Sequence, residues 1–64
     1  MLSTIRHQDT GGLVKVAQYL TGYAARKNAD GIFSANFVTA VCVWQRTNGL
    51  SPDGIIGPKT WAKI

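Results

Sequence analysis

The pattern that decides the fold occurs twice in residues 30–61, which read DGIFSANFVTAVCVWQRTNGLSPDGIIGPKTW. Each copy opens with Asp-Gly and two apolar residues, at 30–33 and again at 53–56. An aspartate can accept hydrogen bonds from the backbone of its own turn, and glycine adopts a positive φ without strain. Each copy therefore predicts a tight turn that leads into a helix, so that one turn–helix unit is used twice.

The first turn leads into a predicted helix over 35–47. Ser34 is its expected N-cap, and Phe33 and Val38 have the spacing of a hydrophobic staple across that cap. Gly49 predicts the end of the helix. Because the helix is apolar on nearly all sides, we expect it to be central and buried.

The second turn leads into a shorter predicted helix over 58–64. Pro58 stands at the first helical position, where its missing N–H costs nothing, and Ile56 and Trp61 repeat the staple. Four aromatic side chains in helices or stapled positions are expected in the core: Phe33, Phe37, Trp44 and Trp61.

A third helix is predicted upstream, over 11–21, with Thr10 as its N-cap and Gly22 as its stop. Its expected buried stripe has the spacing of one helical face: Leu13, Val16, Ala17 and Leu20. Residues 1–9 are interpreted as a polar tail or linker. The fold class is therefore all-α, a compact three-helix bundle over 10–64 with two repeated Asp-Gly turn–helix units.

The composition narrows the class of protein. The 64 residues allow one domain at most, and the single cysteine, Cys42, cannot form an intramolecular disulfide. No apolar run is long enough to cross a membrane, and the polar first residues lack the apolar region of a signal peptide. The net charge of +4 favours anionic partners such as nucleic acid, acidic lipid or cell-wall polymers.

The order and spacing of the motifs over 30–64 resemble the three-helix peptidoglycan-binding domain of bacterial and phage cell-wall lytic enzymes. The motifs that carry the resemblance are DGIF at 30–33, Ala40-Val41, Trp44-Gln45, Gly49-Leu50 and DGIIGPKTW at 53–61. Four residues depart from the usual Gly, Thr, Phe and Gln of the family, namely Ser34, Phe37, Trp44 and Ala17. The resemblance implies non-catalytic retention on peptidoglycan, through its glycan or its stem peptide, at the cell wall or outside the cell in a bacterial or phage-encoded protein. A catalytic domain would be tethered or associated.

Nine residues are candidates for contact with peptidoglycan: Tyr23, Asp30, Gly31, Ser34, Asn36, Asp53, Gly54, Lys59 and Thr60. Tyr23 lies in the predicted loop after the first helix and is the ring that we expect at the surface. The polar candidates at the starts of the second and third helices stand where free backbone N–H groups favour an anion such as a stem-peptide carboxylate. Ordinary solvated helix starts are an equally good interpretation. Asp30 and Asp53 are expected to cap their own turns rather than to form a catalytic pair.

The sequence predicts no catalysis, cofactor or metal site. His7 has no second histidine to share a metal, and Cys42 lies in an apolar run without a charged neighbour, as a buried inert thiol does. The rival hypothesis is a small basic nucleic-acid-binding helical bundle, although the helix over 35–47 holds a single basic residue, Arg46. A structural adaptor is the third interpretation. The other basic residues are expected on a solvated surface: Lys15, Arg26, Lys27 and Lys63.

Overall fold

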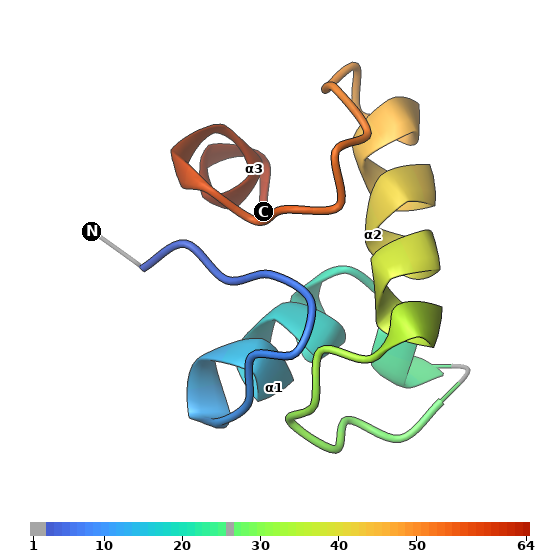
Figure 1. Ribbon diagram of the computed structural model, residues 1–64. Coiled ribbons are helices and arrows are strands. Elements are labelled where there is room, and N and C mark those ends of the chain that lie inside the picture. The colour runs from blue at the N-terminus through green and yellow to red at the C-terminus, as the bar shows by residue number, and fades with distance from the viewer. Residues whose placement is uncertain (1–2, 26) are drawn as a thin grey trace.

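The computed structural model describes residues 3–25 and 27–64. They form helix α1 (Gly12–Leu20), one 3-10 turn η1 (Tyr23–Ala25), helix α2 (Ala35–Thr47) and helix α3 (Pro58–Lys63). Figure 1 shows α2 along one side of the molecule, with α1 and α3 beside it. Two isolated antiparallel bridges are the only extended pairing in this described part of the chain. The all-α three-helix prediction is confirmed, and the three helices lie within one residue of their predicted bounds.

The ends of α2 are formed as the sequence predicts. The Ser34 hydroxyl accepts a hydrogen bond from the backbone N–H of Phe37 at 3.3 Å, so Ser34 is the N-cap. Gly49 follows the helix with φ +75°, and the N–H of Leu50 donates to the carbonyl of Gln45 at 2.8 Å. This is a Schellman motif, which places Leu50 back against the last turn.

The start of α1 differs from the prediction. Thr10 is not the N-cap: it forms an antiparallel bridge with Ile32, and Gly11 occupies the cap position without a side-chain hydrogen bond. The N–H of Gly11 donates to the carbonyl of Gly31 at 2.9 Å. Because Thr10 is held in this extended pairing, it does not occupy the N-cap position of α1.

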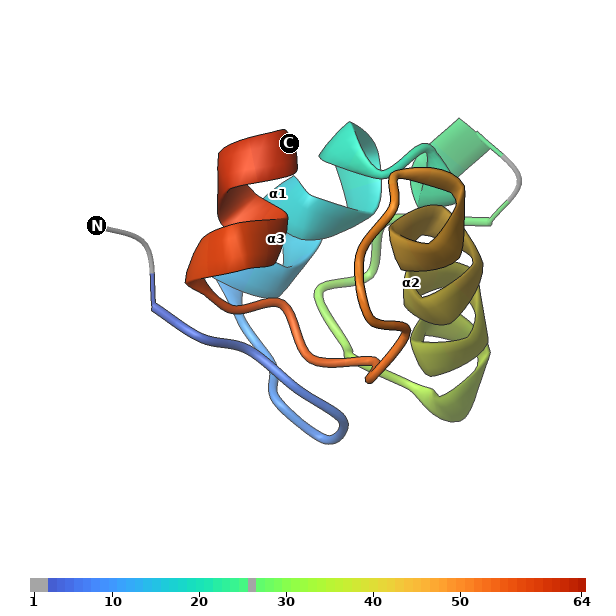
Figure 2. The ribbon, with the colours of Figure 1, turned by 90° about the horizontal axis from the view of Figure 1, so that it is seen from above.

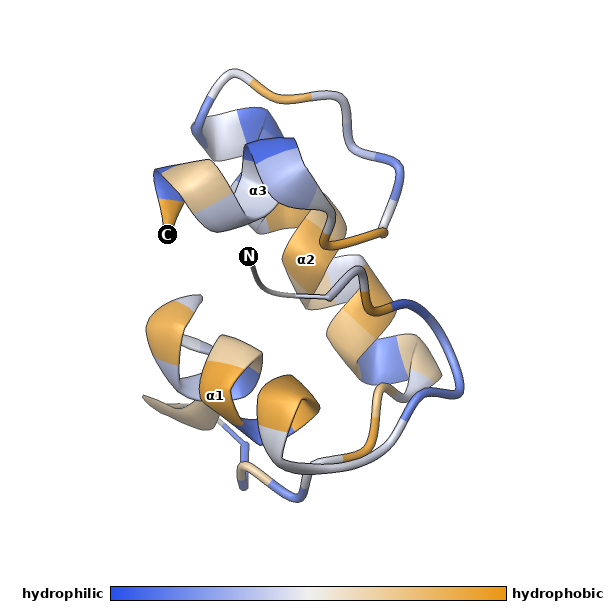
Figure 3. Ribbon diagram, turned by 90° about the vertical axis from the view of Figure 1, so that its left-hand side faces the viewer, coloured by the Kyte–Doolittle hydropathy of each residue, from blue (hydrophilic) through white to orange (hydrophobic). Residues whose placement is uncertain are grey.

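The buried face of α1 also differs from the predicted stripe. The residues that face the core are Val14, Ala17 and Gln18, whereas Val16 and Leu20 are 44% and 55% exposed. Figure 3, coloured by hydropathy, shows apolar residues over much of the α1 ribbon. The prediction is correct for Ala17, which is buried, and for Leu13, which packs against the core, but it is wrong for Val16 and Leu20. It failed there because the inward face contains a glutamine, which a search for apolar periodicity counts as a surface residue.

Helix α2 is buried on one side rather than on nearly all sides. Its buried residues are Phe37, Val41 and Gln45, while Val43 is 55% exposed. Cys42, expected to be a buried thiol, is half-buried, and its Sγ donates to the carbonyl of Pro52 at 3.6 Å. Two other short helices cannot surround a third in a domain this small, because too little chain is available to cover it.

One apolar residue of each repeated turn enters the core. Phe33 and Ile56 are fully buried, and the rings of Phe33 and Phe37 lie 4.6 Å apart at 59°. Burial of each such side chain stabilises the fold by about 1.5–3 kcal/mol. Trp44 and Trp61, expected in the core, are both only half-buried.

Residues 3–9 pack onto the domain instead of forming the expected tail. Ile5 is buried in the core, and it exchanges two backbone hydrogen bonds with Ile56, at 3.0 and 2.9 Å. Phe33 likewise pairs with this segment, because its N–H donates to the carbonyl of Asp9 and its carbonyl accepts from the N–H of Gln8, both at 2.9 Å. Figure 1 shows the segment running between α1 and α3, and Figure 2 shows it along one side of these two helices. We name residues 3–10 the N-terminal strap.

The strap therefore fastens both Asp-Gly turns to one backbone segment. The sequence did not reveal this, since a lone isoleucine among polar residues gives no periodic signal. The predicted tail includes residues 1 and 2, which lie outside the described residues, as does Arg26. Within the described residues, no helix has the length and apolar character that a membrane crossing requires.

Candidate functional site

Each Asp-Gly turn is bound to a buried glutamine of the helix that precedes it. In the first turn, Gln18 Oε1 accepts the N–H of Gly31 at 2.9 Å. Gln18 Nε2 donates to Asp30 Oδ1 at 3.0 Å and to the carbonyl of Ile32 at 3.1 Å. Asp30 Oδ1 also accepts the N–H of Ile32 at 3.0 Å, so one side-chain amide holds three consecutive residues.

Gln45 binds the second turn in the same way. Its Oε1 accepts the N–H of Gly54 at 3.0 Å, and its Nε2 donates to Asp53 Oδ1 at 3.0 Å and to the carbonyl of Ile55 at 2.9 Å. Gln45 Nε2 also donates to the Thr60 hydroxyl of α3 at 3.1 Å. No described buried side-chain nitrogen or oxygen lacks a hydrogen-bond partner.

These contacts change the interpretation of five candidate residues. Gly31, Gly54 and Thr60 are buried, and each of the five candidates makes at least one hydrogen bond inside the domain. The remaining two are Asp30 and Asp53, which cap their own turns as the turn hypothesis expected. These hydrogen bonds commit the backbone N–H groups of Gly31 and Gly54 and one carboxylate oxygen of each aspartate to the frame of the domain. Asp30 and Asp53 themselves are exposed.

The charge of Asp30 follows from its hydrogen bonds. The amide of Gln18, and after it the N–H of Ile32, stabilise the ionised carboxylate and hold the pKa of Asp30 below its ordinary value of 3.8. A carboxyl with a lowered pKa stays ionised at neutral pH, so it is unsuited to act as a general acid.

The candidates at the helix starts are separated by the fold. Ser34 is committed to its cap, while Lys59 borders a shallow hollow of about 310 Å³ together with Asp53. The charges of Lys59 and Asp53 offset each other in that hollow, so it offers an anion no unbalanced positive charge. Tyr23 and Asn36, in contrast, both face a larger groove.

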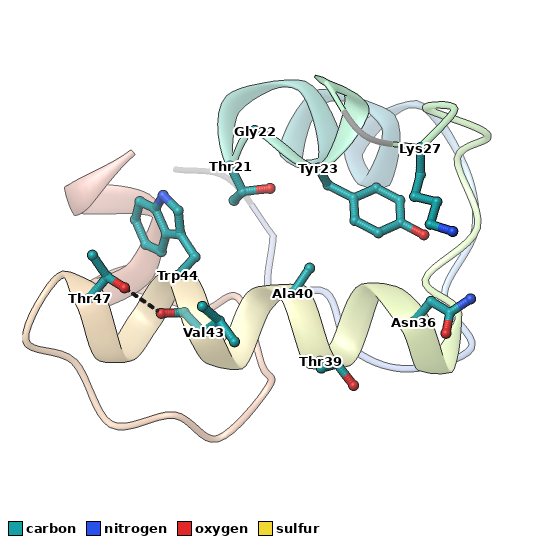
Figure 4. A pocket seen from close by; sticks show the side chains of 10 residues that line it. All are labelled: Thr21, Gly22, Tyr23, Lys27, Asn36, Thr39, Ala40, Val43, Trp44 and Thr47. Atoms are coloured by element: carbon teal, nitrogen blue, oxygen red, sulfur yellow. Dashed lines mark hydrogen bonds between the residues drawn. The ribbon is translucent and has the colours of Figure 1, made fainter.

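This groove of about 540 Å³ lies between η1 and α2, and we call it the η1–α2 groove. Its lining residues are Thr21, Gly22, Tyr23, Lys27, Asn36, Thr39, Ala40, Val43, Trp44 and Thr47. Figure 4 shows Trp44 toward one end and the side chains of Lys27 and Asn36 at the other. The sequence identified only Tyr23 and Asn36 as site residues. The signal that could have found the others is the spacing of 36, 39, 40, 43, 44 and 47, which follows one face of a helix.

The aromatic residues of the groove are held in different ways. The ring of Tyr23 packs against that of Phe37 at 4.9 Å and 59°, so the core fixes its position. Trp44, expected in the core, instead borders the groove and is half-buried. A concave, mostly apolar surface with a few polar groups at its edge is typical of a ligand site.

The model of one protein family, described as "Putative peptidoglycan binding domain", matches residues 11–64. The chain belongs to this family. The resemblance that the sequence suggested is thereby confirmed, and so is the assignment to a binding module rather than an enzyme.

Two solved structures resemble this peptidoglycan-binding domain closely. The crystal structure of the Burkholderia AP3 phage endolysin matches with a TM-score of 0.89 and 40% identity, over 97% of this chain and 24% of that one. A peptidoglycan-binding protein from Clostridioides difficile, in complex with glutamine hydroxamate, matches with a TM-score of 0.82 and 40% identity, over 95% and 39%.

A curated relative extends the comparison. An uncharacterized protein from the bpoA1 3' region of Kitasatospora aureofaciens is 38% identical over 63 residues. The match covers 94% of this chain and 53% of the relative, so the peptidoglycan-binding domain spans about half the length of that protein.

The domain does not assemble a catalytic or metal-binding constellation from its described residues. They contain no group of three histidine, cysteine, aspartate or glutamate residues that could hold a metal ion. The chain has three carboxylate side chains, and each accepts a hydrogen bond from a backbone N–H within its own turn: Asp9, Asp30 and Asp53.

Proposed function

We propose that the domain binds peptidoglycan through the η1–α2 groove and thereby anchors a cell-wall-lytic or cell-wall-modifying protein to the wall. The observation that carries this proposal is the groove itself, an open surface lined by Tyr23, Trp44 and aliphatic residues in a chain of the peptidoglycan-binding family. The polar tips of Tyr23, Lys27 and Asn36 lie together at one end, where they would orient a ligand.

The anchor acts by tethering rather than by tight binding. One small groove offers few contacts, so the affinity of an isolated domain for one repeat of the polymer should be modest. Peptidoglycan presents many identical sites, and a linked catalytic domain stays near its substrate each time the anchor rebinds. The similar endolysin is a longer protein of which this chain covers 24%, which supports a tethered or associated catalytic partner. We place the anchored protein at the cell wall, whether encoded by a bacterium or by a phage.

Co-sedimentation with insoluble peptidoglycan sacculi tests the proposal. The wild-type domain should sediment with the sacculi across a salt series, and Trp44→Ala should lose most of that retention. Tyr19→Ala is the matched control, because Tyr19 is an aromatic residue that is 63% exposed and does not line the groove. Equal loss in both variants, or no sedimentation of the wild type, would contradict the proposal.

A DNA control in the same series tests the nucleic-acid rival. Binding to phosphates releases counterions and falls steeply as salt rises. Helix α2 offers one basic side chain, Arg46, so we expect no DNA binding at a salt concentration that leaves sacculus binding intact.

A further inference from the structure

We infer that the η1–α2 groove binds the stem peptide of peptidoglycan rather than its glycan, with a carboxylate of the peptide held beside Lys27. This inference rests on the proposed function and names the part of the polymer that the same groove takes. Four properties of the groove support it: the grouping of its polar tips, the absence of a carboxylate, the direction in which its threonines donate, and its length.

The polar tips gather at one end. In Figure 4 the hydroxyl of Tyr23, the ammonium of Lys27 and the amide of Asn36 all lie at the end of the groove away from Trp44. The backbone of Lys27 is held close to that of Tyr23, because the N–H of Lys27 donates to the carbonyl of Tyr23 at 2.9 Å. A cation, a hydroxyl and an amide in one place are the donors that a carboxylate needs.

The positive charge at this end is not balanced within the groove. Lys27 is the one charged side chain among the described lining residues. The carboxylates of Asp9, Asp30 and Asp53 are all held in turns outside the groove. The groove therefore attracts an anion, whereas the hollow beside Lys59 contains the carboxylate of Asp53.

The threonines of the groove can accept hydrogen bonds but do not donate toward it. Each hydroxyl donates to a carbonyl four residues earlier in its own helix: Thr21 to Ala17 at 2.7 Å, Thr39 to Ala35 at 3.4 Å and Thr47 to Val43 at 2.9 Å. Their remaining lone pairs suit the N–H groups of a peptide. A glycan needs donors as well as acceptors for its many hydroxyls, and this stretch of the groove supplies few donors.

The length of the groove suits a short peptide. Its α2 wall extends from Asn36 to Thr47, which corresponds to about 16 Å at the helical rise. An extended peptide of about four or five residues spans that distance. Ala40 and Val43 along the groove, and Trp44 toward the end opposite Lys27, offer apolar contacts for small side chains such as methyl groups.

Titration with soluble fragments separates peptide from glycan. The uniformly labelled domain is titrated, with NMR chemical shifts as the readout, against a free stem peptide, the same peptide with its carboxylates amidated, and a glycan oligomer stripped of peptide. The stem peptide should shift amides along 36–47. Amidation should weaken its binding about tenfold, as expected for the loss of a charge-assisted contact, and the bare glycan should not saturate these shifts.

Lysine variants test which side chain contacts the carboxylate of the stem peptide. Lys27→Gln should weaken binding of the stem peptide about tenfold and should bind the amidated peptide as the wild type does. Lys59→Gln, which removes the same charge from another exposed site, should bind both peptides like the wild type. Circular dichroism and thermal melting should show that both variants stay folded, since both side chains are exposed.

The outcomes distinguish this inference from the proposed function. Sacculus retention that persists while the stripped glycan saturates the shifts along 36–47, or an amidated peptide that binds as tightly as the free acid, would overturn the inference and leave the anchor function intact. A wild-type domain that fails to sediment with sacculi would overturn the anchor function itself.

Discussion

The two Asp-Gly turns have the same internal bonding but different surroundings. In both, a buried glutamine accepts the glycine N–H and donates to the aspartate and to the next carbonyl. Gln45 alone reaches further, to the Thr60 hydroxyl of α3. Both turns are tied to the N-terminal strap, the first through Phe33 and the second through Ile56, but the second turn is also tied to another helix.

The connections that precede the two turns differ more than the turns do. Residues 48–52 join α2 to the second turn by a short path, whereas the longer segment 21–29 joins α1 to the first. That longer segment supplies η1 and four lining residues of the groove: Thr21, Gly22, Tyr23 and Lys27. The two turns and their glutamines thus form the frame of the domain, and the longer connection supplies the wall of the η1–α2 groove that faces α2.

Removal of the glutamine amides should give the largest effect and should rank the two turns. Gln45→Leu keeps the side-chain volume but leaves the buried N–H of Gly54 without a partner, and we expect a loss of about 3–4 kcal/mol in the free energy of unfolding. Gln18→Leu should cost about 2–3 kcal/mol, since α3 is not involved. Urea unfolding measures both. A larger loss for Gln18→Leu would contradict the view that the second network carries more of the frame.

Shortening the buried side chain of the strap should give the next largest loss of stability, because the strap joins the two turns. Ile5→Ala removes a side chain buried beside Ile56 and should destabilise the domain by about 2–4 kcal/mol. Arg6→Ala is the control, since Arg6 is an exposed neighbour in the same segment. Thermal melting that shows equal small effects for both variants would mean that residues 3–9 are the tail that the sequence suggested.

Substitution of the turn glycines by alanine should destabilise the first turn more than the second, which is the reverse of the order expected for the glutamine variants. Both Gly31 and Gly54 have a positive φ, and an added Cβ would lie 3.1 Å from a neighbour in each case. At Gly31 that neighbour is the backbone oxygen of Gly11, whereas at Gly54 it is the Val38 side chain, which can shift. We expect losses of about 1–3 kcal/mol by urea unfolding, with Gly31→Ala the larger.

Gly12→Ala is the matched control for these two variants. A Cβ there meets nothing within 4 Å, and the residue is helical. It should be neutral or stabilising by up to about 1 kcal/mol. If the turn variants behaved like Gly12→Ala, neither the positive φ nor the close contacts would matter.

The smallest predicted effect concerns the charge of Asp30. Because its pKa is lowered in the folded state, the ionised form contributes stability above the ordinary pKa of 3.8, and this contribution is lost as the pH falls through the lowered value. Asp30→Asn keeps an acceptor oxygen but removes the charge. The melting temperature of the wild type should exceed that of the variant at neutral pH, and the gap should close in acid. A gap independent of pH would show that the charge contributes nothing.

The sequence by itself determined the repeated frame. The Asp-Gly phrases, the Ser34 cap and the Gly49 stop are local signals, since each depends on residues within one or two turns of chain. They sufficed to predict α2 and the approximate bounds of α1 and α3. The ordered motifs over 30–64 also sufficed to indicate the family.

Tertiary structure decided which faces are buried and where the groove lies. Gln18 enters the core because it bonds a turn that comes 13 residues later, and Ile5 because it pairs with Ile56 far along the chain. Trp44 borders the groove because two short helices leave that side of α2 uncovered. Such placements depend on partners distant in sequence, and hydropathy along the chain contains no information about them.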